Sequence, residues 1–533
     1  MQKRVVALFF LFSMAFGLLS LRIVELNDST AVTDAAATKS SLTVTVSETR
    51  GNIFDCKMRP LVNEENELYV AIKPTLSALN AASAVIGDTD KDALFETVTD
   101  GKIALAPATG TLETDEAKTV TAVRRYRDVG LAVHLIGYVN GDGEGVSGIE
   151  KYYDTILKNA SGTLKATYPV DALGHILEGG EISFVAENYH SPAGVMLTLD
   201  RDIQTIAQEA LEKFEIQVGA VVVLDANTAE IRAMASVPAF NQNHPEESLN
   251  AENAPFVNRA ITPYSVGSVF KAVVAAAAIE KGIDTDFSYT CSGSYTIGET
   301  VFNCHNRSGH GTQNMGEAMA NSCNPYFIEL ALETGADDVC AMGENLGLGA
   351  QIELADGFYT ETGIMPDKSS IASKQDLANL AFGQGQLLAS PLQMAAVYAA
   401  IANNGIYRAP SLMQAIVDAS GEEVQRAFLP VSRRAMSKTT AETVGELLHD
   451  TVENGSGKKA KPASCSAAGK TGTAQSGWIN DDGTEVTQSW YCGYFPYEDP
   501  QYVVTVLKEN GEGGSVDCAP VFAYIADEIL KLS

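Results

Sequence analysis

The run of small apolar residues from Val273 to Ala278 most constrains the fold of this chain. It lies within Tyr264 to Glu280, which reads YSVGSVFKAVVAAAAIE. A helix that is apolar on every side has to be buried, so the run predicts a helix at the centre of a core. Ser268 and Lys271 stand three residues apart at its head, and one helical turn would place them on the same face.

A serine beside a lysine at the head of a buried helix suits nucleophilic catalysis. Burial disfavours the charged form of Lys271, which turns its amine into a base. That base can take the proton of the Ser268 hydroxyl as the oxygen attacks a carbonyl. The same spacing also occurs by chance on solvated helices, so this interpretation depends on the rest of the chain.

Two further short motifs follow. Ser322-Cys323-Asn324 stands on a loop between two expected helices, and Lys470-Thr471-Gly472-Thr473 stands before an expected strand. Ser-x-x-Lys, Ser-x-Asn and Lys-Thr-Gly together mark penicillin-binding proteins and serine β-lactamases. The predicted catalytic residues are therefore Ser268, Lys271, Ser322, Asn324 and Lys470, and the predicted substrate-binding residues are Thr471, Gly472 and Thr473.

Each motif supplies a group that acyl transfer needs. Ser322 can relay a proton to the leaving amine, and the side-chain amide of Asn324 can hold the substrate backbone. A second ammonium at Lys470 is expected to lower the pKa of Lys271 by like-charge repulsion. The threonines beside Lys470 suit a substrate carboxylate, and the backbone N–H groups of Ser268 and Thr473 are expected to form an oxyanion hole.

Length and charge limit the class of protein. A chain of 533 residues exceeds the size at which one core stops growing, so two or more domains are expected. The hydrophobic share of 45% and the charged share of 20% are those of a globular protein. A net charge of -30 and a pI near 4.6 argue against nucleic acid or an anionic lipid surface as a partner.

The N-terminus predicts a membrane anchor. Lys3 and Arg4 precede an uncharged run from Val5 to Leu21, which is long enough to span a bilayer. Basic residues before the span place the N-terminus in the cytoplasm and the bulk of the chain outside the cell membrane. The alternative is a cleaved signal peptide, for which Ala35 to Ala37 would be small enough.

The expected elements predict an α+β fold. Strands are expected at 42–48, 219–224, 230–236, 488–494 and 502–508. An apolar stretch at 195–199 precedes Asp200, which is expected to cap the next helix. Helices are expected at 203–213, 315–322, 326–333, 391–403, 440–453 and 519–532. Helices between two groups of strands imply one antiparallel sheet with a helical cluster. A strand, a glycine-rich loop and a helix near Ile149 are expected within His134 to Leu157. The domains are predicted as 1–25 anchor, 26–190 pedestal and 191–533 catalytic.

With these motifs the chain resembles the class B penicillin-binding proteins, the monofunctional peptidoglycan D,D-transpeptidases. Arg50 to Asp55 is similar to an RGxIxD element of that family's elongated pedestal, or dimerisation, domain. Further segments similar to the family are Ser147-Gly148-Ile149-Glu150 with Tyr153-Asp154, Thr198-Leu199-Asp200, Gly219 to Val223, Asn258-Arg259-Ala260, Gly383-Gln384-Gly385 and Ser390-Pro391-Leu392-Gln393. The chain departs from the family at Cys56, Met58 and Val266, where Arg, Gly and Pro are usual.

The resemblance implies cross-linking of peptidoglycan stem peptides through a Ser268 acyl-enzyme, without a cofactor. It also implies capture by β-lactams and, as partners, the cell membrane and a membrane glycan polymerase of wall synthesis. It leaves open whether the role is in elongation, division or sporulation. A D,D-carboxypeptidase or β-lactamase would use the same acyl-enzyme, and a non-catalytic β-lactam sensor or division scaffold would keep the fold.

Three of the eight cysteines fall in one segment together with a histidine. Cys291, Cys304, His310 and Cys323 form a Cys₃His set that suits a structural, tetrahedral zinc ion, with His305 as the other candidate for the nitrogen ligand. Such an ion would pin the loop that carries Ser322. A Cys304–Cys323 disulfide outside the cell, or buried free thiols packed as small hydrophobes, are the alternatives.

Overall fold

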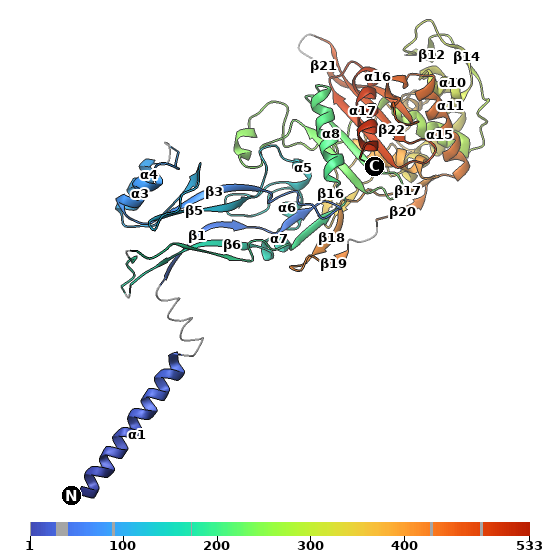
Figure 1. Ribbon diagram of the computed structural model, residues 1–533. Coiled ribbons are helices and arrows are strands. Elements are labelled where there is room, and N and C mark those ends of the chain that lie inside the picture. The colour runs from blue at the N-terminus through green and yellow to red at the C-terminus, as the bar shows by residue number, and fades with distance from the viewer. Residues whose placement is uncertain are drawn as a thin grey trace. The chain divides into compact units, whose positions relative to one another are not determined.

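The structure is a computed structural model that describes residues 2–27, 41–87, 91–171, 173–177, 179–426, 430–479 and 483–532. The chain divides into two compact units, whose elements are labelled in Figure 1. The first unit comprises Met1–Arg50, Asn63–Arg125 and Ala160–Ser191, and the second comprises Gly51–Val62, Tyr126–Asn159 and Pro192–Ser533.

Residues 51–62 and 126–159, which the predicted division places in the pedestal, pack with the residues after 192. One reason is that β2 (Asn52–Phe54) pairs in parallel with β8 (Gly194–Leu197), so its backbone groups are satisfied in the second unit. The division into 1–25, 26–190 and 191–533 as separate domains stays a prediction.

Helix α1 (Gln2–Asn27) contains one stretch long and apolar enough to cross a membrane, Val6–Val24. Its apolar side chains are exposed, for example Phe9, Phe12 and Phe16. This is the pattern expected of a helix whose partner is lipid. The alternative cleavage site at 35–37 lies outside the described residues.

The described residues of the first unit form two antiparallel three-stranded sheets. One has the order β1-β6-β7 and the other the order β4-β3-β5. The bounds are β1 (Ser41–Thr49), β3 (Glu65–Ile72), β4 (Ala104–Ala108), β5 (Ala117–Arg124), β6 (Gly162–Pro169), β7 (Ser183–Glu187), α3 (Leu76–Ala82) and α4 (Lys91–Thr99). Only the first strand was expected from the sequence. Strands β3 and β5 do not alternate cleanly between buried and more exposed positions. Strand β6 does alternate, so its pattern was an available signal.

The strand expected at the start of 134–157 is wrong. Residues Val133–Ile136 form a helical turn, α5, whose Val133, Leu135 and Ile136 side chains are all buried. The apolar run therefore reflects burial of a helical turn. The helix expected near Ile149 is present as α6 (Gly148–Tyr152), and α7 (Asp154–Asn159) follows it.

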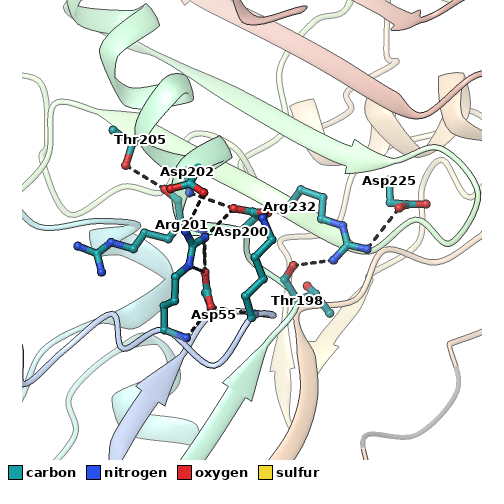
Figure 2. Close-up of polar contacts among 10 residues, drawn as sticks. Asp55, Thr198, Asp200, Arg201, Asp202, Thr205, Asp225 and Arg232 are labelled. Carbon is teal, nitrogen blue, oxygen red and sulfur yellow. Dashed lines mark hydrogen bonds and ion pairs between the residues drawn. The ribbon is translucent and has the colours of Figure 1, made fainter. Parts of the chain in front are cut away.

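A charged cluster holds the segment that carries β2 against the start of α8 (Arg201–Lys213). Arg59 donates hydrogen bonds to Asp55 at 2.7 Å, Asp200 at 2.9 Å and Asp202 at 2.7 Å. Figure 2 shows these three carboxylates turned toward one another beside the helix. Asp200 also accepts from the N–H of Asp202, which confirms it as the cap of α8.

The centre of the second unit is a five-stranded antiparallel sheet with the order β10-β9-β23-β22-β21. The bounds are β9 (Gly219–Asp225), β10 (Ile231–Val237), β21 (Ala468–Ile479), β22 (Glu485–Phe495) and β23 (Tyr502–Glu509). Helices α8 and α17 (Ala519–Leu530) pack together on one face of it (Figure 1). Val221 and Val223 face these two helices, whereas Val222 and Leu224 face the other side.

A helical cluster covers that other side. It contains α9 (Lys271–Glu280), α10 (Met315–Ala320), α11 (Asn324–Thr334), α12 (Ala336–Asn345), α13 (Lys374–Ala381), α14 (Pro391–Ala402) and α15 (Lys438–Glu453). Residues 271–278 of α9 are all buried. Helices α11, α12 and α15 contact α9. The predicted central helix and the predicted α+β arrangement are both present.

Smaller elements complete the second unit. They are β11 (Tyr289–Cys291), β12 (Ser294–Ile297), β13 (Thr300–Asn303), β14 (Gly311–Gln313), β15 (Glu353–Ala355), β16 (Phe358–Tyr359), β17 (Ile406–Arg408), β18 (Met413–Val417), β19 (Glu423–Arg426), β20 (Ser432–Arg434), α16 (Gly514–Asp517) and the 3-10 turns η2 (Pro245–Ser248), η3 (Gly267–Phe270) and η4 (Lys458–Ala460). Strands β11 to β14 form two hairpin-like pairs next to α11. Cys291 of the cysteine cluster described below is the last residue of β11, Cys304 directly follows β13, and His310 directly precedes β14.

Candidate active site

Ser268 and Lys271 lie at the junction of η3 and α9. The backbone N–H of Lys271 donates to the Ser268 carbonyl, which closes one 3-10 turn between them. Side chains three residues apart on such a turn lie one above the other. Ser268 is half-buried, whereas Lys271 is 0% exposed. The hydroxyl can therefore reach a ligand while the amine stays in the core.

The Lys271 ammonium reaches the loop between α10 and α11 and the first residue of α11. Its Nζ donates to the Ser322 carbonyl at 2.7 Å, to Ser322 Oγ at 3.3 Å and to Asn324 Oδ1 at 2.7 Å. Ser322 adopts a left-handed backbone conformation, with φ of 53°. A serine in this region is uncommon and is held there by its surroundings. The structure thus brings the first two predicted motifs together.

Burial sets the protonation state of Lys271. It lowers the pKa of this amine to about 7, although Cys323 and Cys304 act in the opposite direction. A lysine with such a pKa is partly uncharged near neutral pH and can act as a base.

Lys470 is also fully buried, and its Nζ donates to the Thr471 carbonyl at 3.0 Å. Burial lowers the pKa of Lys470 well below its usual range, and repulsion from Lys271 lowers it further. Repulsion between two ammonium groups is mutual, so the expected effect of Lys470 on the pKa of Lys271 stays a prediction. Burial is the largest cause of the lowered pKa of Lys271.

The third motif lies within β21, and not before a strand as expected. Lys470 pairs with Cys492 of β22 and Thr473 pairs with Ser489, so the motif runs along the edge strand of the sheet. The second edge of β21 has no neighbouring strand among the described residues. Thr473 is exposed on this strand. An edge strand can offer backbone N–H and C=O groups to an extended peptide.

Two glycines allow the turn that carries Ser268 to approach the edge strand. Gly267 has φ of 63°, and a Cβ there would lie 2.7 Å from the Thr473 carbonyl oxygen. Its N–H donates to the Gly383 carbonyl at 2.8 Å. A Cβ at Gly383 would lie 2.0 Å from the Gly267 oxygen. The backbone of the Ser268 turn is thus packed between these two segments, and only glycine fits at both positions.

Two contacts of the site were missed by sequence reasoning. Ser456 lies in the loop between α15 and η4, and its N–H donates to the Ala320 carbonyl at 2.8 Å. Its Oγ accepts from Thr471 Oγ1 at 3.4 Å. The loop therefore joins the end of α10 to the edge strand. The Gly-Ser-Gly sequence around Ser456 was the available signal, since such a turn permits close backbone approach.

The cysteine cluster stands directly behind Ser322. The ligand atoms of Cys291, Cys304, His310 and Cys323 all lie within 4.8 Å of one another. Cys304 Sγ lies 3.6 Å from His310 Nδ1 and 3.9 Å from His305 Nδ1. Three of the four side chains are buried and His310 is half-buried. A Cys₃His set of this size fits the tetrahedral coordination of zinc.

The thiols of this cluster are not equivalent. A hydrogen bond from Cys323 lowers the pKa of Cys304, although burial acts in the opposite direction. The same hydrogen bond raises the pKa of Cys323. All eight cysteines lie in the described part of the chain and are free thiols there.

Comparison with known proteins identifies the family. The family model for the penicillin-binding protein transpeptidase domain matches residues 219–527, more than half of the 533-residue chain. The chain belongs to this family. The matched residues of this penicillin-binding protein contain all three motifs, so the resemblance drawn from the sequence is confirmed.

Individual relatives agree with the family. Penicillin-binding protein PbpB from Mycolicibacterium smegmatis is 30% identical over 462 residues, which is 80% of this chain and 68% of that protein. Stage V sporulation protein D from Bacillus subtilis is 28% identical over 430 residues, which is 77% of this chain and 64% of that protein. The chain thus spans about two thirds of the length of these curated relatives.

A solved structure agrees with the fold. The crystal structure of the D,D-transpeptidase domain of a peptidoglycan glycosyltransferase from Eggerthella lenta is 27% identical to this chain. The structural match covers 91% of this chain and 99% of the Eggerthella lenta chain, with a TM-score of 0.65. The penicillin-binding transpeptidase fold expected from the sequence is therefore confirmed.

Proposed function

We propose that this penicillin-binding protein is a serine-type peptidoglycan D,D-transpeptidase that cross-links stem peptides. The observation that carries the proposal is the contact of the buried Lys271 amine with Ser322 and Asn324, one 3-10 turn from Ser268. The similar domain from Eggerthella lenta is named a D,D-transpeptidase domain, which supports the reaction class.

In the proposed reaction, Ser268 Oγ attacks the carbonyl between the two terminal D-alanines of a donor peptide. Neutral Lys271 takes the hydroxyl proton, and Ser322 passes a proton to the nitrogen of the leaving D-alanine. The backbone N–H groups of Ser268 and Thr473 stabilise the oxyanion. An amine of a second stem peptide then attacks the ester, which releases Ser268 and forms the cross-link.

The other groups hold the donor. Asn324 Nδ2 donates to the Asn303 carbonyl at 3.3 Å, which orients its amide beside Lys271. The edge strand would bind the carboxylate and backbone of the donor through Thr471, Gly472 and Thr473. A D,D-carboxypeptidase or a β-lactamase would use the same groups with water as acceptor, and a non-catalytic sensor would use none of them for turnover.

Labelling with a fluorescent penicillin tests the acyl-enzyme. We expect the wild-type chain to form a stable adduct and Ser268→Ala to form none, while Ser456→Ala still forms one. An adduct that persists in Ser268→Ala would overturn the assignment of the nucleophile. No adduct with the wild type would remove all acyl-enzyme functions and favour a non-catalytic scaffold.

The acceptor distinguishes the enzymes. Incubation with uncross-linked peptidoglycan polymer should release D-alanine together with dimeric stem peptides. Release of D-alanine with only tetrapeptide monomers would indicate a carboxypeptidase. Rapid loss of the penicilloyl adduct would indicate a β-lactamase.

We further propose that α1 anchors the chain in the cell membrane with its bulk on the outer side, where the peptidoglycan lies. The apolar stretch Val6–Val24 supports this placement. The partners would then be stem peptides, β-lactams and a membrane glycan polymerase. The acidic net charge of -30 supports the exclusion of nucleic acid.

We also propose that Cys291, Cys304, His310 and Cys323 hold one structural zinc ion, and that catalysis itself needs no cofactor. The distance of at most 4.8 Å between their ligand atoms supports the site. Because Cys323 is the N-cap of α11 and follows Ser322, the ion would fix the catalytic loop.

Metal analysis of anaerobically purified chain tests the zinc site. We expect roughly one zinc per chain, lost in Cys291→Ser. Cys340→Ser provides the matched control, because Cys340 is buried outside the cluster. A protein with no zinc and three free thiols in the cluster would contradict the proposal. Loss of two thiols without zinc would indicate the Cys304–Cys323 disulfide.

A further inference from the structure

The segment between β23 and α17, which includes the short helix α16 and is called the β23–α17 loop below, contains a buried carboxylate that the mechanism above does not use. Asp517 is 6% exposed. It accepts from Ser489 Oγ at 2.6 Å, from Lys508 Nζ at 2.9 Å and from the N–H of Gly513 at 2.9 Å. Three donors from β22, β23 and the loop itself thus meet at one side chain. Hydrogen bonds to a charged acceptor are the stronger kind, so this loop is held firmly.

The part of the loop that Asp517 holds packs against the Lys470–Thr473 motif. The N–H of Gly514 donates to Thr473 Oγ1 at 3.4 Å. A Cβ at Gly514 would lie 2.1 Å from the Trp490 carbonyl oxygen and 2.5 Å from that of Gly472. The loop backbone therefore packs directly against both strands at the position of Thr473.

We propose that Asp517 is a positioning residue that orients the Thr473 hydroxyl toward the carboxylate of the ligand. A hydroxyl that accepts from an N–H on one side directs its own proton elsewhere. The hydrogen bond from Gly513 to Asp517 fixes the backbone at Gly513. This fixes the direction of the next N–H, that of Gly514, which donates to Thr473 Oγ1. The inference rests on the proposed function, because it takes the ligand to be an acyl donor or β-lactam with a carboxylate beside Thr473.

Charge alone predicts the opposite effect of Asp517. A carboxylate near the site repels an anionic ligand, so its neutralisation would improve binding of that ligand. Positioning predicts that Asp517→Asn weakens binding, because the amide cannot accept from all three donors. The direction of the change therefore separates the two effects.

The test compares benzylpenicillin with its methyl ester on the full chain. In the wild type the acid should acylate faster than the ester. In Asp517→Asn the ratio of their second-order acylation constants should fall about fivefold or more. Asp527→Asn is the matched control, since Asp527 of α17 accepts from Ser464 Oγ at 2.6 Å and from the N–H groups of Ala463 and Ser464, away from Thr473. Its ratio should not change.

Two further measurements keep the inference independent of folding and of catalysis. In a Thr473→Val background Asp517→Asn should have no additional effect on the ratio, whereas a general structural defect would lower both constants equally. Equilibrium binding of acid and ester to Ser268→Ala by calorimetry gives the same comparison without acylation. An unchanged or increased preference for the acid in Asp517→Asn overturns the inference. If the wild type is not acylated, but Ser268→Ala still binds the acid more tightly than the ester and loses this preference with Asp517→Asn, only the proposed function is overturned.

Discussion

Lys271 can act as a base only in its uncharged form. Its pKa, lowered by burial to about 7, places the change of charge near neutral pH. We expect the acylation rate constant with a penicillin to rise from about pH 6 to about pH 8 with a midpoint near 7, because the neutral amine is the active form. Stopped-flow kinetics across this range provide the measurement.

Lys271→Arg is the control for this pH dependence. Arginine keeps its charge throughout the range, so any residual acylation should lack the rise near pH 7. A wild-type profile that is flat across these values would contradict the role of Lys271 as base. Thermal unfolding of the variant would show whether it is folded.

The close approach at Gly383 provides a second test. In Gly383→Ala the new Cβ would lie 2.0 Å from the Gly267 oxygen, so the Ser268 turn has to move. We expect acylation to fall roughly tenfold or more, since small displacements of a nucleophile are costly. Gly282→Ala is the matched control, because Gly282 also has a positive φ of 91° but has nothing within 4 Å of its Cβ position. It should lose about 1 kcal/mol of stability and keep its activity.

At the scale of elements, the Arg59 cluster is expected to stabilise the second unit. Asp55 is 0% exposed and Asp200 is 8% exposed. Loss of Arg59 removes its guanidinium from the buried Asp55 carboxylate, whereas Asp200 keeps its ion pair with Lys57. We expect Arg59→Met to lower the free energy of unfolding by about 2 kcal/mol or more. Lys57→Met should cost under about 1 kcal/mol, because Lys57 is 54% exposed and pairs only with Asp200 among these carboxylates.

The same cluster has a defined pH dependence. Burial raises the pKa of Asp200, but hydrogen bonding and attraction from Lys57 and Arg59 outweigh it, so the pKa lies below its usual value. Such a group contributes stability above its unfolded pKa and loses it as the pH falls through the folded pKa. The difference in melting temperature between wild type and Arg59→Met should therefore shrink in acid. A constant difference down to about pH 3 would show that Asp200 is not the partner that matters.

Residue type and spacing predicted the elements that carry the site, but not how they meet. Ser268 and Lys271 were predictable because one turn of helix relates them, and the cysteine cluster because its donors are chemically distinctive. The contacts of Ser456 with Ala320 and of Gly383 with Gly267 join segments that are distant in the chain. A local sequence pattern does not indicate which distant residues will meet. The helical turn at 133–136 was mistaken for a strand because a short buried run has no diagnostic period.

For the molecule as a whole, the active site depends on complete folding of the second unit. The proposed nucleophile lies in the turn before the central helix, the proposed proton relay on a loop beside a cysteine cluster, and the proposed substrate edge on a strand near the C-terminus. The three motifs come together only when the helices pack on the sheet. Partial folding therefore yields no acyl-enzyme, and covalent labelling by penicillin reports the folded fraction.

The placement of the whole chain at the membrane is the last prediction. Helix α1 carries two basic residues before an apolar stretch of 19 residues, and the net charge of the chain is -30. This asymmetry favours a cytoplasmic N-terminus. We expect protease added to right-side-out vesicles to digest the chain down to a short anchor fragment, and alkaline extraction to leave the intact chain in the membrane. Protection of the chain would contradict this orientation. Release of a chain that begins after residues 35–37 would identify a cleaved signal peptide.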